Sequence, residues 1–194
     1  MARKGLEFSE YRRKRENKTD YSSRLKYLKS GTERVVIRKT NARIFVQLIA
    51  FNPRGDKVIV SADSTFLKKY GWGLSGNSLP AAYLTGYLFS KIAASKKVDL
   101  NKDYIVDFGT NIIIKGNKLF AALKGVVDGG LKVKVGSDEV FPSEDRLKGK
   151  HISEHFKLVK EGTQYSKIKE NKDLSDVPTL LDKVVKAINS GVKA

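Results

Sequence analysis

Three short motifs in the chain have the residue types and spacing of catalytic or cofactor sites. Gly71, Gly73 and Gly76 form G-x-G-x-x-G before a helical pattern, as in loops that bind a dinucleotide pyrophosphate. That chemistry requires a strand immediately before the first glycine and an acidic residue about 20 positions later. Residues 65–70 favour a short helix instead, and the window near residue 96 holds lysines. The glycines therefore do not predict a dinucleotide site.

The other two motifs also lack the context that their chemistry needs. Residues 107–109 read D-F-G, but the chain has no H-R-D loop and is too short for a protein kinase. Residues 151–155 read H-x-x-E-H, as in inverted zinc peptidases, and would share one helix face. No distant carboxylate ligand can be singled out, and two histidines without a cysteine do not support a nucleophile–base pair. The sequence thus predicts no catalytic residue, no metal site and no cofactor.

The charge of the chain points to a polyanionic partner. Its 194 residues include 38 Lys or Arg and 21 Asp or Glu, which gives a formal net charge of +17. Such an excess is typical of proteins that bind nucleic acid. The lack of cysteine fits a reducing compartment, and the first residues contain no apolar run that would indicate a signal peptide. The most apolar stretch, 68–97, is interrupted by polar residues, so we expect a soluble cytoplasmic protein with no membrane partner.

Two segments combine cations with aromatic rings, and the first is the N-terminal arm. Residues 1–31 hold ten Lys or Arg against four Asp or Glu, interleaved with Phe8, Tyr11, Tyr21 and Tyr27. Cations contact the phosphates of RNA, and rings stack on its unpaired bases. The arm is too polar to form its own core, so it should become ordered on a partner or on a neighbouring surface. The alternative is a solvated charged tail.

The second segment is the glycine-rich loop at 68–77, which has two interpretations. It is either a tight connection with an incidental tryptophan, or a loop that carries Lys68, Lys69, Tyr70 and Trp72 to an RNA. In the second case, replacing Tyr70 or Trp72 should weaken specific binding by about 1–3 kcal/mol for each lost base stack.

The hydrophobic pattern predicts an α/β fold that positions these segments. The predicted strands are 33–39, 43–51, 57–61, 102–108 and 131–135, and the predicted helices are 64–70, 78–97 and 118–128. Residues 43–51 are apolar on both alternating faces, which predicts a central strand covered on both sides. The element order predicts a three-layer, ribonuclease-H-like fold with a mixed five-stranded sheet. Small residues at 82, 86, 90 and 93 should let the long helix lie close against that sheet.

The rest of the chain adds a helical extension, which gives three predicted parts. These are a basic RNA-binding arm (1–31), a central α/β domain (32–140) and a helical C-terminal extension (141–194). A polar helix begins near residue 143, and Asp176 followed by Pro178 predicts the start of a last helix. The apolar stripe of that last helix packs either on the domain or on another protein.

The predicted fold raises the possibility of a nuclease, which the carboxylates argue against. A ribonuclease-H-like nuclease needs carboxylates on the first strand, the first long helix and the fourth strand, to hold two Mg²⁺ ions about 4 Å apart. Glu33 lies only at the start of the first strand, the helix 78–97 has no acidic residue, and Asp107 alone is suitably placed. We therefore expect that the protein is not an enzyme.

The longest motifs together resemble a known family. In chain order they are the arm YRRKRENKTDYSSRLKYLKSG, the strand pair VVIRKTNARIFVQLI, the loop and helix KKYGW…GN…PAAYLTGYL, then VDFG, KLFAALKGVVDGGL and HISEH. Over residues 8–155 the chain is similar to large-subunit ribosomal protein eighteen, in the longer form seen in archaea and, more distantly, in eukaryotes.

The resemblance implies a non-catalytic, ribosome-bound component of the translational machinery. It implies binding to 5S rRNA and attachment of that RNA to the large-subunit rRNA in the central protuberance, beside neighbouring large-subunit ribosomal proteins. The implied RNA contacts lie on the arm, at the end of the first strand, in the glycine-rich loop and after the fourth strand. They are Tyr11, Arg12, Arg13, Lys14, Arg15, Lys18, Thr19, Tyr21, Arg24, Lys26, Lys29, Arg38, Asn41, Lys68, Lys69, Tyr70, Trp72, Asn77, Asn111, Lys115 and Lys118. The competing hypotheses are a nuclease or nucleotide enzyme and a general RNA chaperone outside the ribosome.

Overall fold

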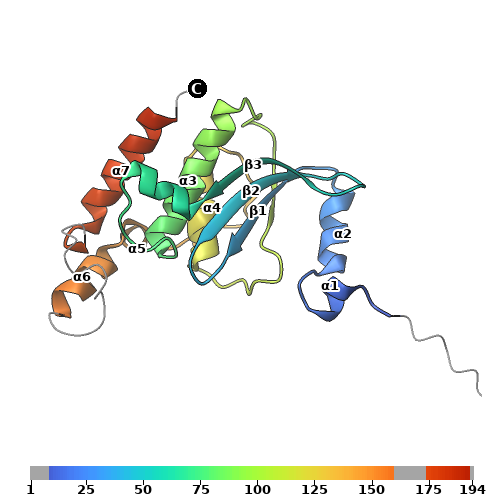
Figure 1. Ribbon diagram of the computed structural model, residues 1–194, viewed down its shortest axis with the longest axis horizontal. Coiled ribbons are helices and arrows are strands. Elements are labelled where there is room, and N and C mark those ends of the chain that lie inside the picture. The colour runs from blue at the N-terminus through green and yellow to red at the C-terminus, as the bar shows by residue number, and fades with distance from the viewer. Residues whose placement is uncertain (1–8, 160–173, 193–194) are drawn as a thin grey trace, which may run out of the picture.

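A computed structural model describes residues 9–159 and 174–192 of the chain. Its centre is a four-stranded mixed sheet with the strand order β3-β2-β1-β4. Figure 1 shows β1, β2 and β3 side by side. The first three strands form an antiparallel meander, and β4 pairs in parallel with β1. The strands are β1 (Arg34–Lys39), β2 (Ile44–Ala50), β3 (Lys57–Asp63) and β4 (Ile105–Asp107). The prediction of an α/β fold with a mixed sheet is therefore confirmed.

Local hydrogen bonds form both turns of the meander. In the β1–β2 turn, the amide of Thr40 donates to the carbonyl of Arg43 at 2.8 Å. In the β2–β3 turn, the amide of Gly55 donates to the carbonyl of Asn52 at 2.9 Å, and the Asn52 side chain accepts from the amide of Arg54 at 3.0 Å. An asparagine that folds back on its own turn in this way is typical of β-turns. The turns fix the register of the meander.

Two helices, α3 (Leu79–Ser95) and α4 (Lys118–Asp128), lie on one face of the sheet. Side chains alternate between the faces along β2: Ile44, Val46 and Leu48 are fully buried toward these helices, and the residues between them are only half-buried. Residues 43–51 are therefore not covered equally on both sides. The expected three-layer arrangement is wrong for the two core helices, because they pack side by side on the same face.

The predicted fifth strand at 131–135 is wrong for the described residues. Val133 forms only an isolated parallel bridge with Tyr104, and Leu131 is buried in the core. The neighbouring strand β4 is only three residues long, so it offers little edge for a further strand to pair with. The ribonuclease-H-like assignment and the division into three parts stay predictions.

The backbones of α3 and α4 touch where each helix has a glycine. A Cβ on Gly86 would lie 1.9 Å from the carbonyl oxygen of Ala122, and a Cβ on Gly125 would lie 2.0 Å from the carbonyl oxygen of Tyr83. Ser90 donates its hydroxyl to the carbonyl of Val126 at 2.7 Å in the same contact. The small residues that were expected to face the sheet therefore serve mainly to let the second helix approach.

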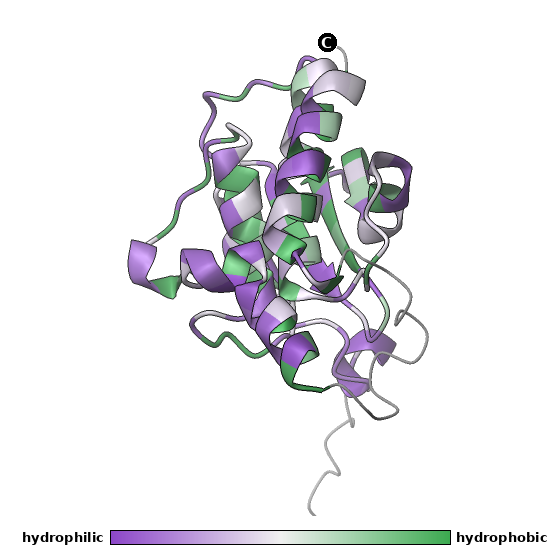
Figure 2. Ribbon diagram, turned by 90° about the vertical axis from the view of Figure 1, so that its left-hand side faces the viewer, coloured by the Kyte–Doolittle hydropathy of each residue, from purple (hydrophilic) through white to green (hydrophobic). Residues whose placement is uncertain are grey.

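The C-terminal elements pack back on α3. This decides whether the apolar stripe of the last helix packs on the domain or on another protein. After η2 (Asp138–Val140) come α5 (Glu144–Lys148), α6 (Lys150–Leu158) and α7 (Val177–Gly191). The apolar stripe of α7 is buried with residues of α3 and of the 3₁₀-helix η1 (Ser64–Tyr70) in a second hydrophobic cluster. Figure 2 shows that these helices are amphipathic, because hydrophobic and hydrophilic residues follow one another along them. The stripe is therefore an intrachain contact.

The arm contributes two helices beside the opposite face of the sheet. They are α1 (Arg12–Arg15) and α2 (Tyr21–Lys29), which lie away from the helical layer in Figure 1. Asp20 caps α2 by accepting from the amides of Ser22 and Ser23 at 2.9 and 3.2 Å. Phe8 lies outside the described residues.

Candidate nucleic-acid interface

Ion pairs attach the arm helix α2 to the sheet. Arg34, which is 2% exposed, donates to Asp56 at 2.8 Å and to Asp107 at 3.2 Å. Arg24 of α2 donates to the same Asp56 at 2.9 Å. A buried arginine held between two carboxylates fixes the relative positions of β1, the β2–β3 turn and the end of β4. The arm therefore has an ordered base on the protein, as the alternative of a neighbouring surface predicted.

Arg38 takes part in the same network and is only partly available to a partner. Its Nη2 lies 2.9 Å from Asp107 Oδ1, and its Nη1 donates to the carbonyls of Ile37 and Asp107. Gly109 has φ +66° and approaches so closely that a Cβ would lie 2.8 Å from Arg38 Cζ. The D-F-G sequence thus serves a structural purpose: its aspartate binds two arginines, and its glycine makes room for one of them.

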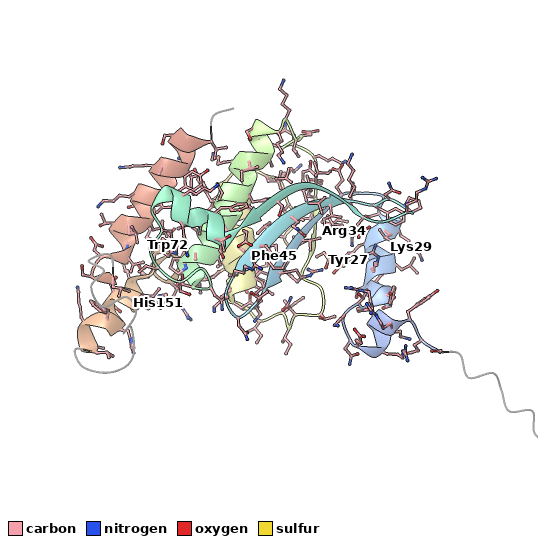
Figure 3. The ribbon with its side chains drawn as sticks, viewed as in Figure 1. Tyr27, Lys29, Arg34, Phe45, Trp72 and His151 are labelled. Carbon is pink, nitrogen blue, oxygen red and sulfur yellow. The ribbon has the colours of Figure 1, made fainter. Side chains whose placement is uncertain are left out.

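The outer surface of the arm is exposed and basic. All four residues of α1 are exposed, as are Lys18, Lys26 and Lys29. Lys29 is labelled on the side of α2 away from the sheet in Figure 3, and Tyr27 on the side toward it. Burial and, after it, the charge of Asp107 raise the pKa of the Tyr27 hydroxyl. The exposed cations can contact phosphates, whereas Tyr27 belongs to the contact with the sheet.

Two tyrosines on the arm offer aromatic surface. Tyr11 is 74% exposed, and its ring centroid lies 5.5 Å from that of Tyr21 in a tilted arrangement. Thr19 is half-buried and accepts from Arg13 Nε at 2.8 Å, which orients that guanidinium. The arm thus presents an exposed ring among cations, as single-stranded RNA recognition requires.

The glycine-rich loop departs from its prediction at the tryptophan. Trp72 is 1% exposed, and its Nε1 donates to the carbonyl of Ser75 at 3.3 Å, so the ring cannot stack on a base. Figure 3 shows it inside the body of the protein, between η1 and α7. The expectation that Trp72 contacts RNA is wrong, because the second hydrophobic cluster needs a large apolar ring beside α7. Tyr70 is half-buried in the same cluster, and Lys68 and Lys69 are exposed.

Replacing Trp72 with phenylalanine should therefore change stability and not RNA binding. The smaller ring and the lost hydrogen bond should lower the free energy of unfolding by about 1–2 kcal/mol. Urea unfolding and RNA titration of the same variant measure the two effects, with Lys68→Gln as the opposite control, which should weaken binding at unchanged stability. A Trp72→Phe variant that unfolds like the wild type but binds RNA weakly would contradict the buried position.

The remaining predicted RNA contacts lie in loops between the strands and helices. Asn77 donates through Nδ2 to the carbonyl of Asn41 at 2.9 Å, which ties the start of α3 to the β1–β2 turn. Asn111 donates to the carbonyl of Phe108 at 2.7 Å, and Lys115 is exposed and pairs with Glu139 at 3.2 Å. The two asparagines therefore hold loops in place before any partner is considered.

Lys118 and Lys39, which ends β1, continue the basic surface between the arm and these loops. Burial and, after it, the charge of Lys39 lower the pKa of the half-buried Lys118 amine. Lys39 follows Arg38 at the end of β1, so the basic surface runs from the arm across this strand end to the starts of α3 and α4. Lys39 was not among the predicted contacts, although its place after Arg38 was a usable signal.

Neither a metal site nor a membrane span is found in the described ranges. Within 9–159 and 174–192, no three His, Cys, Asp or Glu side chains lie close enough to hold a metal ion. In the same ranges, no helix is long and apolar enough to cross a membrane.

The sequence also matches a known family and several known proteins. Residues 8–106 match the model of the family described as ribosomal large subunit proteins 60S L5 and 50S L18. The chain is 49% identical over 164 residues to large ribosomal subunit protein uL18 of Korarchaeum cryptofilum, covering 84% of this chain and 82% of that protein. The protein of the same name from Sulfurisphaera tokodaii is 39% identical over 189 residues, covering 93% and 94%. That from Methanoregula boonei is 48% identical over 143 residues, covering 74% and 80%.

Proposed function

The chain belongs to the family of ribosomal large subunit proteins 60S L5 and 50S L18, and from this we propose that it binds 5S rRNA and helps attach it to the large-subunit rRNA in the central protuberance. Membership makes it a ribosomal protein of the cytoplasm rather than an enzyme, with rRNA and other ribosomal proteins as its surroundings. The particular RNA and the place in the subunit are the proposal.

The observation that carries the proposal is the anchored arm. Its exposed cations and the exposed ring of Tyr11 extend from a base that Arg24, Asp56 and Arg34 fix to the sheet. A flexible polybasic tail would bind any polyanion, whereas cations held at fixed positions favour an RNA of matching shape. The anchored arm thus supports recognition of one folded RNA over general binding.

The proposed contacts are those of the sequence analysis without Trp72, and they have different roles. Exposed arm cations and Lys68, Lys69 and Lys115 contact phosphates, and Tyr11 stacks on a base. Arg24, Arg38, Asn41, Asn77 and Asn111 position the loops through the hydrogen bonds given above. The neighbouring ribosomal proteins complete the surroundings.

A competition between two RNAs tests the proposal. The full chain should bind a 5S rRNA transcript at least about tenfold more tightly than an unrelated structured RNA of equal length, a difference of about 1.4 kcal/mol. Fluorescence anisotropy at several salt concentrations measures both affinities, because the non-specific part of the binding depends on salt. Equal affinity for the two RNAs would favour a general RNA chaperone and reject specific 5S recognition.

A further inference from the structure

An open pocket lies where the first turns of α3 and α4 meet, outside the arm. Its volume is about 440 Å³, and residues of β1, α3, α4, α5 and α6 and of the loops before α3 and α4 line it. The lining residues that matter below are Lys39, Asn77, Leu79, Lys118, Arg146 and His151. His151 is labelled in Figure 3, on α6. Five elements thus bring polar groups to one place.

The pocket has an excess of positive charge that the protein does not neutralise. Across the described residues, no ion pair joins Lys39, Lys118 or Arg146 to a carboxylate. Lys118 is half-buried, and burial and Lys39 together lower the pKa of its amine. The pKa of His151 is lowered by burial and then by Arg146, although Glu154 acts in the opposite direction. Unpaired cations in a partly desolvated recess are a binding site for an anion.

The first residues of α3 and α4 line the same pocket. Ser78 caps α3 by accepting from the amide of Ala81, and Asn117 caps α4 by accepting from the amides of Leu119 and Phe120. In the described ranges, the amides of Leu79 and Lys118 have no hydrogen-bond partner. Free amides at the start of a helix bind oxyanions, and here two helices of 17 and 11 residues present them together.

The buried polar atoms give an independent indication that the protein alone does not complete this site. The part of the chain that is described has two buried side-chain polar atoms without a hydrogen-bond partner, Asn77 Oδ1 and His151 Nδ1. Both residues line this pocket. Buried polar groups in proteins are almost always paired, so two exceptions at one place mark a site that a partner completes. The His151 ring nitrogen can donate to a phosphate oxygen, whereas Asn77 Oδ1 is an acceptor and needs a donor, such as a ribose hydroxyl of the same RNA backbone.

We propose that this pocket holds a backbone phosphate of the bound rRNA, with Lys39, Lys118 and Arg146 as its charged partners and the amides of Leu79 and Lys118 as donors. The proposal rests on the proposed function, because it adds a second contact to the RNA that the arm binds. The pocket is open, and Lys39 continues the basic surface of Arg38, so a chain of linked phosphates can reach both sites. Arg146 and His151 come from the extension, which gives the extension a place in RNA binding.

A triple variant with a charge-matched control tests the pocket. Lys39→Gln, Lys118→Gln and Arg146→Gln are combined in the full chain, and the control combines Lys57→Gln, Lys183→Gln and Lys186→Gln, which are exposed residues of β3 and α7. Affinities for 5S rRNA and for the large-subunit rRNA are measured against salt. For at least one of these RNAs, the slope of log K against log salt should fall by about 1 unit in the pocket variant, as the loss of one phosphate contact predicts, and change less in the control. Equal slopes for pocket variant and control on both RNAs would overturn the proposal.

NMR spectra of the protein test RNA binding at the pocket separately from binding at the arm. In ¹⁵N NMR spectra of the full chain, a short oligoribonucleotide should shift the backbone amides of Leu79 and Lys118, and the single variant Lys118→Gln should reduce those shifts. If these amides do not shift while arm amides do, the pocket proposal fails and the proposed function stands. If the wild type does not distinguish 5S rRNA from an unrelated RNA, the proposed function fails instead. Thermal unfolding of each variant checks that the fold is retained.

Discussion

Replacing Gly86 with alanine lowers the free energy of unfolding by about 3 kcal/mol, because the added methyl group has no space. Its Cβ would lie 1.9 Å from the carbonyl oxygen of Ala122 and 2.9 Å from the amide nitrogen of Val126. These are backbone atoms of α4, so no side chain can rotate away. The two helices must separate, which disturbs Ser90 and the residues that both helices bury against the sheet.

Urea and thermal unfolding measure this loss, with Gly136→Ala as the matched control. A Cβ on Gly136 would meet no atom within 4 Å, and its backbone is not in the left-handed region, so that variant should be close to neutral. For a chain of this size the Gly86→Ala loss corresponds to a fall in Tm of about 6–12 °C. Equal stability of the two variants would show that the helices are not in backbone contact.

Removing the charges of α1 should produce the largest change in RNA binding. If roughly six to ten phosphates are neutralised, the affinity of the wild type should fall by about 10³ to 10⁵ between 50 and 200 mM salt. Changing Arg12, Arg13, Lys14 and Arg15 to glutamine should lower the slope of log K against log salt by about 3 units. At physiological salt that corresponds to a loss of affinity on the order of 10²-fold.

The fold should not respond to the same change, because α1 is exposed throughout. Its ion pairs are local: Arg12 with Glu16 at 3.7 Å, and Lys14 with Glu10. Surface pairs of this kind contribute little to stability. Circular dichroism and unfolding of the quadruple variant should match the wild type. Unchanged RNA affinity in a folded quadruple variant would remove the arm from the interface.

The sequence predicted well wherever local signals decide the structure. The helix at 118–128 has the predicted bounds, and the helix predicted at 64–70 forms as the 3₁₀-helix η1; the Asp20 cap and the turn at 52–55 are formed by equally local signals. Each of these depends on hydrogen bonds between residues close in the chain. The basic arm was equally visible, because charge needs no tertiary information.

The predictions that were wrong depend on contacts between distant segments. An isolated tryptophan in a glycine-rich loop fits an exposed ring and a buried one equally well, and only the packing of α7 decides for burial. The small residues of α3 indicate a close approach but not its partner, which is α4 rather than the sheet. The pocket draws on Lys39 and Arg146, which are more than a hundred positions apart in the chain, so no spacing rule could find it.

The backbone contact of α3 and α4 at Gly86 and at Gly125 has a consequence for how the protein meets its partner. Helices whose main chains touch cannot slide or rotate past each other without breaking the contact. The separation between their first turns is therefore set by the backbone contact of the two helices. A ligand that binds at the first turns of α3 and α4 therefore meets two helix ends at a fixed separation. The packing of the apolar core determines how well such a ligand fits.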